Sequence, residues 1–122
     1  MLEVRSATVA FAGVPALAAV DLTVADREVV AVLGASGSGK TTLLRAVAGL
    51  QALEEGTIRW DGADLAAVPP HRRGFGLVFQ DFALFPHLDV GRNVEFGLRM
   101  QGLPPSERHR RAAAALESVE LP

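Results

Sequence analysis

Apolar and polar residues alternate in the N-terminal part of the chain, a spacing typical of strands with one buried face. The clearest case is 20–24, where three apolar residues alternate with two polar ones. Residues 2–10 and 57–60 are also predicted as strands, and the pair Asp61-Gly62 predicts the turn that closes the latter. The chain is therefore expected to begin with an antiparallel β region.

The middle of the chain shows a different spacing. Residues 28–33 are apolar without alternation, as expected of a strand buried on both faces. The apolar residues of 41–48 fall on one helical face, and Gly49 is placed as the C-cap of that helix. Residues 75–79 are predicted as a further strand, so the chain combines strands and helices in an α/β arrangement.

Two helices are predicted in the C-terminal third, over 90–101 and 106–119. Pro104-Pro105 separates them, and Ser106 is expected to be the N-cap of the second. A second buried parallel strand does not follow in the sequence, so most parallel neighbours of 28–33 are expected to be missing from this chain.

One stretch carries recognisable chemistry, the octet Gly34-Ala35-Ser36-Gly37-Ser38-Gly39-Lys40-Thr41. It fits G-x-x-x-x-G-K-[ST], a loop whose backbone amides surround nucleotide phosphates. Lys40 is the single lysine of the chain; all other cationic side chains except histidine are arginine. A compact ammonium suits the pocket beside the β- and γ-phosphates better than a planar guanidinium. The predicted strand before the loop and helix after it supply the required context.

Composition narrows the remaining possibilities. The chain has 122 residues, 49% apolar and 21% charged, which fits one small globular domain. The net charge of −2 gives no reason to propose nucleic acid as a partner. The absence of cysteine excludes disulfides and thiolate metal sites. Charges interrupt every apolar stretch, so any membrane-spanning partner is expected to be a separate polypeptide.

A second motif is the segment 77–88, with Gln80 at the end of a predicted strand. With this segment and the octet, the chain resembles the N-terminal part of an ATP-binding-cassette (ABC) transporter ATPase subunit. The octet matches Walker A, Gln80 matches the Q-loop glutamine, and Phe11 stands where the family places an aromatic ring on adenine. The stretches 69–73 and 93–98 are most similar to bacterial importers of iron, thiamine, polyamines, sulfate or sugars. The resemblance spans essentially the whole chain.

The resemblance implies a P-loop NTPase core with an antiparallel β subdomain and the start of a helical subdomain, apparently truncated. It divides the chain into 1–80, the β subdomain and P-loop core, and 81–122, the Q-loop and the start of the helical subdomain. ATP and Mg²⁺ are the implied cofactors. Lys40 and Gln80 are the implied catalytic residues, and Thr41 and Gln80 the metal ligands. The implied nucleotide-binding residues are Phe11, Gly34, Ala35, Ser36, Gly37, Ser38, Gly39, Lys40, Thr41 and Thr42.

The resemblance also implies partners and a location. Segment 82–101 would contact a membrane-spanning permease subunit, through apolar side chains. A second ATPase subunit would complete a head-to-tail dimer, and the protein would be cytoplasmic, on the inner face of the cell membrane. The apolar contacts expected in this segment are Phe82, Leu84, Phe85 and Leu88. The alternative is that these side chains fill a core.

Other family motifs are missing from the 122 residues: the Walker B acid with its catalytic glutamate, the Ser-Gly-Gly signature and the switch histidine. Without them the chain alone is expected to bind nucleotide but to hydrolyse it negligibly. One alternative is a self-contained small NTPase that uses Asp81 as its Walker B acid. The other is a non-enzymatic nucleotide-binding or docking module.

The histidines and paired arginines support no further site. The three histidines lack metal-ligand spacing and are expected in loops or on the surface. Arg72-Arg73 is expected to be a solvated face. Trp60, at a strand end, is expected to serve packing.

Overall fold

The structure is a computed structural model of the chain, and it describes residues 1–81 and 83–121. The chain forms two compact units, Met1–Val78 and Phe79–Pro122, which we call the first and second unit.

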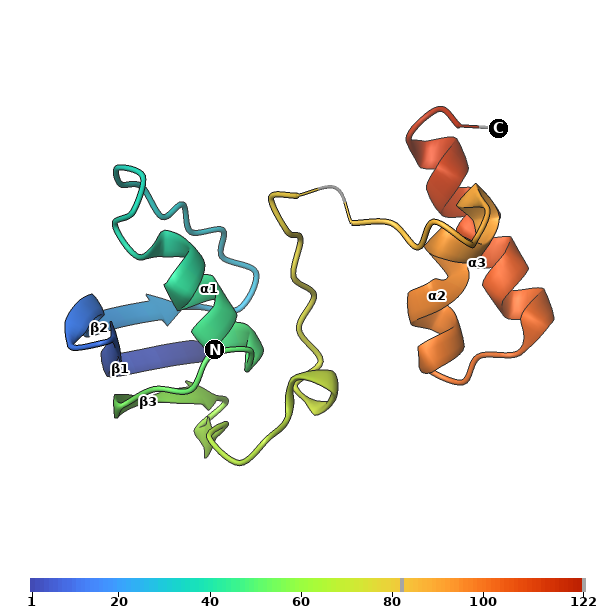
Figure 1. The fold of residues 1–122 in the computed structure, drawn as a ribbon. Helices are drawn as coiled ribbons and strands as arrows, with labels where there is room; N and C mark the ends of the chain where they lie inside the picture. Colours follow the sequence, from blue (N-terminus) through green and yellow to red (C-terminus); the bar gives the residue numbers. More distant parts are fainter. Residues whose placement is uncertain (82, 122) are drawn as a thin grey trace. The chain divides into compact units, whose positions relative to one another are not determined.

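The first unit contains an antiparallel four-stranded sheet in the order β2-β1-β3-β4 (Figure 1). The strands are β1 Leu2–Phe11, β2 Val14–Val24, β3 Glu55–Trp60 and β4 Ala63–Asp64. The antiparallel β region and the Asp61-Gly62 turn are confirmed. The second strand is longer than predicted, because its alanine-rich first half also pairs with β1, with Leu17 opposite Val9.

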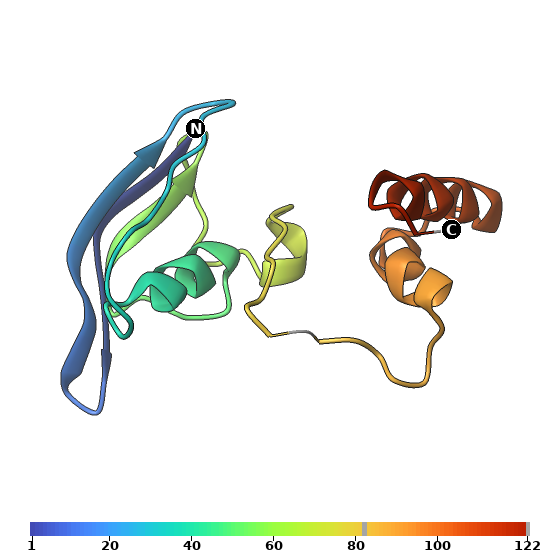
Figure 2. The same cartoon turned by 90° about the horizontal axis from the view of Figure 1, so that it is seen from above.

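Helix α1, Lys40–Ala48, packs on one face of this sheet (Figure 2). It ends at Gly49, as predicted, with a left-handed backbone at φ 89°. The core lies between the helix and the sheet, because apolar side chains from several elements meet there. Its buried members are Val4, Ala7, Val9, Leu17, Leu43, Ala46, Ile58 and Leu65.

The expected strands at 28–33 and 75–79 are not formed. Instead of being buried on both faces, Val29 and Leu33 are 95% and 91% exposed, and Val78 is 94% exposed. A strand exists only where a neighbour accepts and donates its backbone hydrogen bonds, and no described strand pairs with either segment. An apolar run therefore does not form a strand unless neighbouring strands pair with it.

The second unit contains α2, Val90–Met100, and α3, Pro105–Ser118, which pack against each other. Both helices were predicted, but the N-cap of α3 is Pro104 and not Ser106. Pro105 occupies the first turn, where its missing N–H is no loss. Among the described residues, none of the helices has the length and apolar character needed to cross a membrane.

Candidate functional site

The predicted phosphate loop lies directly before α1 in the first unit. The Ser38 amide donates to the Ala35 carbonyl over 3.1 Å, which closes a tight turn through Ser36 and Gly37. Gly37 has φ 80° and Gly39 has φ 95°, both in the left-handed region that favours glycine. The helix begins immediately afterwards, at Lys40.

Two glycines of the loop are also required by close contacts. A Cβ at Gly39 would overlap the carbonyl oxygen of Ala16 on β2. A Cβ at Gly34 would lie 2.6 Å from the Ser38 hydroxyl oxygen, well inside normal contact distance. The loop thus packs against β2 in a way that a side chain at position 39 would prevent, whereas a side chain at position 34 would displace the Ser38 hydroxyl.

Lys40 joins the two ends of the loop. Its Nζ donates to the carbonyl oxygens of Gly34, at 2.5 Å, and Ala35, at 2.7 Å, and to the Ser38 hydroxyl at 3.2 Å. The ammonium is thereby held at the loop, half-buried, at the N-terminus of α1. The structure thus brings together Gly34, Ala35, Ser38 and Lys40.

The N-terminus of α1 is suited to an anion. Its N-cap, Gly39, has no side chain that could accept from the first amides, and the first turn contains no acidic residue. The first amides of a helix lack acceptors within the helix, and the helix dipole adds partial positive charge there. Together with Lys40, this arrangement fits the donor set that a phosphate chain requires. Thr41 is exposed on the same turn, and Thr42 is half-buried.

The remaining predicted site residues lie elsewhere. Phe11 ends β1 with its side chain 53% exposed, beside the Ala12-Gly13 turn. Gln80 and Asp81 are exposed, in a bend of the second unit before α2. Contact of Phe11 with adenine, and of Thr41 and Gln80 with Mg²⁺, therefore stays a prediction. Among residues 1–81 and 83–121 there is no cluster of acidic or histidine side chains that could hold a metal by itself.

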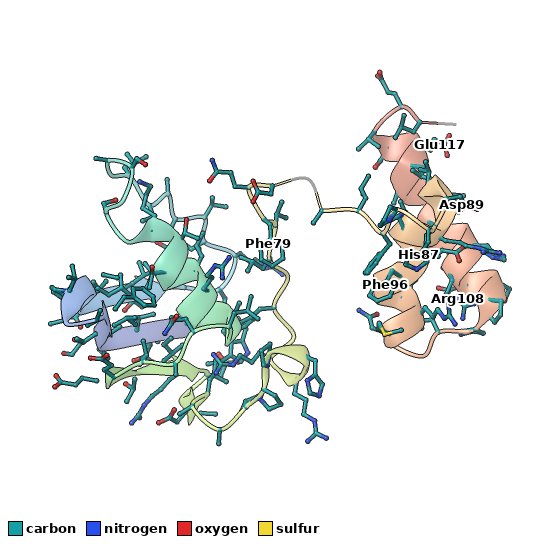
Figure 3. The ribbon with its side chains drawn as sticks, viewed as in Figure 1. Phe79, His87, Asp89, Phe96, Arg108 and Glu117 are labelled. Atoms are coloured by element: carbon teal, nitrogen blue, oxygen red, sulfur yellow. The ribbon has the colours of Figure 1, made fainter. Side chains whose placement is uncertain are left out.

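The segment expected to contact a permease is partly packed and partly exposed. Leu84 is 74% exposed, whereas the Phe85 ring packs on Phe96 of α2 with 4.4 Å between the ring centroids. His87 and Asp89 lie on the stretch that leads into α2 (Figure 3). The predicted contact at Phe82 lies outside the described residues.

Asn93 is a functional candidate that the sequence did not single out by chemistry. Its side-chain oxygen accepts from the Phe85 amide at 2.9 Å, and its nitrogen donates to the carbonyls of Phe85, Leu88 and Asp89. One amide side chain thus shapes the stretch 85–89, which lies within the predicted docking segment. Asp89 caps α2 by accepting from the Arg92 amide at 2.8 Å.

Arg73 is the second residue missed, because the prediction of a solvated face is wrong for it. Its guanidinium is partly buried and donates to four backbone carbonyls, whereas Arg72 is exposed. Burial lowers the pKa of Arg73, partly opposed by the charge of Asp64. Nothing in the local sequence distinguishes the two neighbouring arginines. The three histidines are exposed, as predicted, and His109 lies 3.2 Å from Glu95.

The model of the ABC transporter family matches residues 17–122. The chain is 57% identical, over all 122 residues, to the Fe(3+) ions import ATP-binding protein FbpC of Streptomyces avermitilis, and covers 35% of that relative. It is also 50% identical over 108 residues to the spermidine/putrescine import ATP-binding protein PotA of Frankia alni. That match covers 88% of this chain and 23% of the relative.

Solved structures agree with this similarity. The dimeric ATP-binding cassette MJ0796, in a post-hydrolysis state bound to ADP and Pi, superimposes with a TM-score of 0.86 and 29% identity. The match covers 100% of this chain and 58% of that one. The chain belongs to the ABC transporter family. Family and fold class are thus as predicted, and the chain spans about a third of the length of the FbpC relatives.

Proposed function

We propose that this chain is the nucleotide-binding part of the ATP-binding subunit of an importer, and that it holds the phosphates of Mg²⁺-ATP. One observation carries the proposal: a glycine-lined loop holds the Lys40 ammonium at the N-terminus of α1, where the first amides lack side-chain acceptors. Such a terminus favours multiply charged anions, and the loop sequence is that of phosphate-binding loops.

The proposed roles follow from the chemistry of each group. Amides of the loop and of the first turn of α1 would donate to phosphate oxygens, and the Lys40 ammonium would hold the β- and γ-phosphates. Thr41 contributes its hydroxyl, and Gln80 its amide oxygen, to Mg²⁺, a hard cation that prefers oxygen ligands. Phe11 offers an exposed ring face for stacking on adenine. When bound, Mg²⁺-ATP would supply the phosphoanhydride bond whose hydrolysis drives transport in the complete protein.

Hydrolysis by the 122 residues alone is proposed to be negligible. The chain supplies the phosphate loop and Gln80, but its sequence contains no Walker B acid followed by glutamate and no Ser-Gly-Gly signature. Phosphoryl transfer depends on positioned charge, so their absence removes most of the rate enhancement. Steady-state ATPase assays should give a turnover below about 1 s⁻¹; a faster rate would favour the self-contained NTPase.

The proposal of a role in transport is based on the relatives. Their names describe ATP-binding proteins that import Fe(3+) ions or spermidine and putrescine, and we propose solute uptake for the protein to which this chain belongs. Segment 82–101 would contact the membrane-spanning permease, and a second ATPase subunit would pair head to tail. The subunit would then lie in the cytoplasm against the inner face of the membrane.

Titration calorimetry with Mg²⁺-ATP tests the binding proposal. The chain should bind, and Lys40→Ala should abolish both the heat and the nucleotide-dependent rise in Tm. Arg45→Ala is the matched control, because Arg45 is an exposed cation on the same helix. Absence of binding by the folded chain, or equal binding by Lys40→Ala, would reject the proposal.

The assignment of Gln80 as a Mg²⁺ ligand is tested by comparing variants of Gln80 and Asp81. Gln80→Ala should weaken the Mg²⁺ dependence of binding, whereas Asp81→Asn should leave it unchanged. The opposite result would identify Asp81 as the metal ligand and favour the self-contained NTPase.

A further inference from the structure

The guanidinium of Arg73 lies at the C-terminal end of α1. Its Nη1 donates to the carbonyl oxygens of Ala46 at 3.2 Å and Val47 at 3.1 Å. The last carbonyls of a helix have no amide partners within the helix, and a cation there is favoured by the helix dipole. Arg73 therefore caps α1 from outside the helix.

The other side of the same guanidinium reaches the segment after β4. Nη2 donates to the Leu65 carbonyl at 2.7 Å, and Nε donates to the Val68 carbonyl at 2.8 Å. An arginine fork can donate in several directions within one plane, which a lysine ammonium cannot reproduce. One side chain thus ties α1 to the stretch 65–68.

Glycine at position 49 makes this approach possible. A Cβ on Gly49 would lie 2.7 Å from Nε of Arg73 and 2.9 Å from its Cζ. The residue two positions after Arg73 is also fixed, because Phe75 packs edge-on against Trp60 with 5.3 Å between centroids. The guanidinium is therefore held by its own chain on one side and by the end of α1 on the other.

Helix α1 has few other anchors. Of its nine residues, Leu43 and Ala46 are buried, and Val47 is partly buried against the same core. At its N-terminus, Gly39 packs against β2. A helix of nine residues is about 13 Å long, so a tilt of about 20° around its buried middle would move each end by about 2 Å. Such a displacement exceeds the tolerance of a hydrogen bond.

We propose that Arg73 is a positioning residue for nucleotide binding: by fixing the C-terminal end of α1, it fixes the direction in which the N-terminus presents Lys40 and the loop amides. This inference rests on the proposed function. The hydrogen bonds of Arg73 go to the end of α1 and to the stretch 65–68, so it would act on the phosphate loop through α1.

Calorimetry with Mg²⁺-ATP on the 122-residue chain tests the inference with Arg73→Lys and Arg73→Ala. Arg73→Lys keeps the charge and loses the fork. Arg72→Ala is the matched control, since Arg72 is the neighbouring arginine and is exposed. Circular dichroism establishes that each variant is folded at the temperature used; if Arg73→Ala is unfolded, Arg73→Lys decides.

Both Arg73 variants should bind Mg²⁺-ATP at least about fivefold more weakly, and Arg72→Ala should bind like the unaltered chain. Ethylguanidinium should restore binding to folded Arg73→Ala, a rescue that general destabilisation would not give. Folded Arg73→Lys with unaltered affinity would overturn the inference while Lys40→Ala still tests the proposed function. If the unaltered chain fails to bind, the proposed function is rejected and this inference with it.

Discussion

The first unit (Met1–Val78) and the second (Phe79–Pro122) are stabilised in different ways. In the first unit, eight buried side chains from β1, β2, β3, α1 and the stretch after β4 form one cluster. In the described part of the second unit, Ala112 is the one fully buried apolar residue. The first unit thus depends on contacts between distant parts of the chain, whereas the described residues of the second unit form no comparable core.

Short-range interactions replace a core in the second unit. Asp89 caps α2, Asn93 binds the stretch before it, and Glu107 lies within 2.8 Å of Arg110 and Arg111 nitrogens on α3. Such contacts contribute less than the burial of large apolar groups. Substitutions should therefore have global effects in the first unit and local effects in the second.

The largest effect is expected for Leu43→Ala, which removes the buried anchor between α1 and the sheet. The free energy of unfolding of the first unit should fall by about 2–4 kcal/mol, from lost burial and the resulting cavity. Urea unfolding measures it. Leu44→Ala is the control, since Leu44 is 49% exposed and its removal should change stability by less than about 0.5 kcal/mol. Equal effects would contradict the assigned core.

A smaller, local effect is expected for Asn93→Ala. The variant loses four hydrogen bonds to the backbone of 85–89, so the Phe85 amide should exchange with solvent about 10-fold faster, corresponding to about 1–2 kcal/mol. Amide hydrogen exchange followed by NMR measures it, with exposed Arg99→Ala as control. Asn93→Asp keeps the acceptor for the Phe85 amide and should be intermediate. Unfolding of the first unit by either variant would contradict the claim that substitutions in the second unit have local effects.

A pH effect is expected in α3. Hydrogen bonds from Arg110 and Arg111 hold the pKa of Glu107 below its ordinary value of 4.5. A depressed carboxyl pKa stabilises the folded helix above the unfolded value, and this is lost as the pH falls through the folded pKa. NMR shifts of α3 should report a loss of order below pH 4.5 that Glu107→Gln abolishes. The same profile in both forms would show that the pairs do not contribute.

The smallest effect is expected at the N-terminus. Hydrogen bonds to Asp26 and Asp61 raise the pKa of the Met1 amino group above its ordinary value of 8.0. Its contribution is present below the unfolded pKa and is lost as the pH rises through the folded one. Exposed groups interact weakly, so a slight fall in Tm above pH 8.0 is expected, and Asp61→Asn should reduce it. A Tm that rises with pH there would contradict the assignment.

The sequence predicts elements whose determinants are local and misses those whose determinants are distant. Alternation identified the second half of β2, and Gly49 marked the end of α1. Segments 28–33 and 75–79 have the composition of strands, but strand formation depends on neighbours that the described chain does not provide.

For the candidate site, the octet coincides with a glycine turn and the start of α1, whereas the strand predicted before it is not formed. Arg73 could not be distinguished from Arg72, because its role arises from carbonyls more than 20 residues earlier in the chain. Asn93 contacts residues closer in sequence, but the sequence of a predicted helix does not indicate that an asparagine in it binds the preceding loop.

Left-handed glycines stand at both ends of α1, and together they set the length of that helix. Gly39 stops it from extending backwards into 34–38, and Gly49 stops it from continuing forwards. The first bond within the helix runs from the Leu43 amide to the Gly39 carbonyl, so a helix extended backwards would engage the amides of residues 40–42 as internal donors. Because Gly39 prevents growth in that direction, these three N–H groups stay available to an acceptor outside the helix.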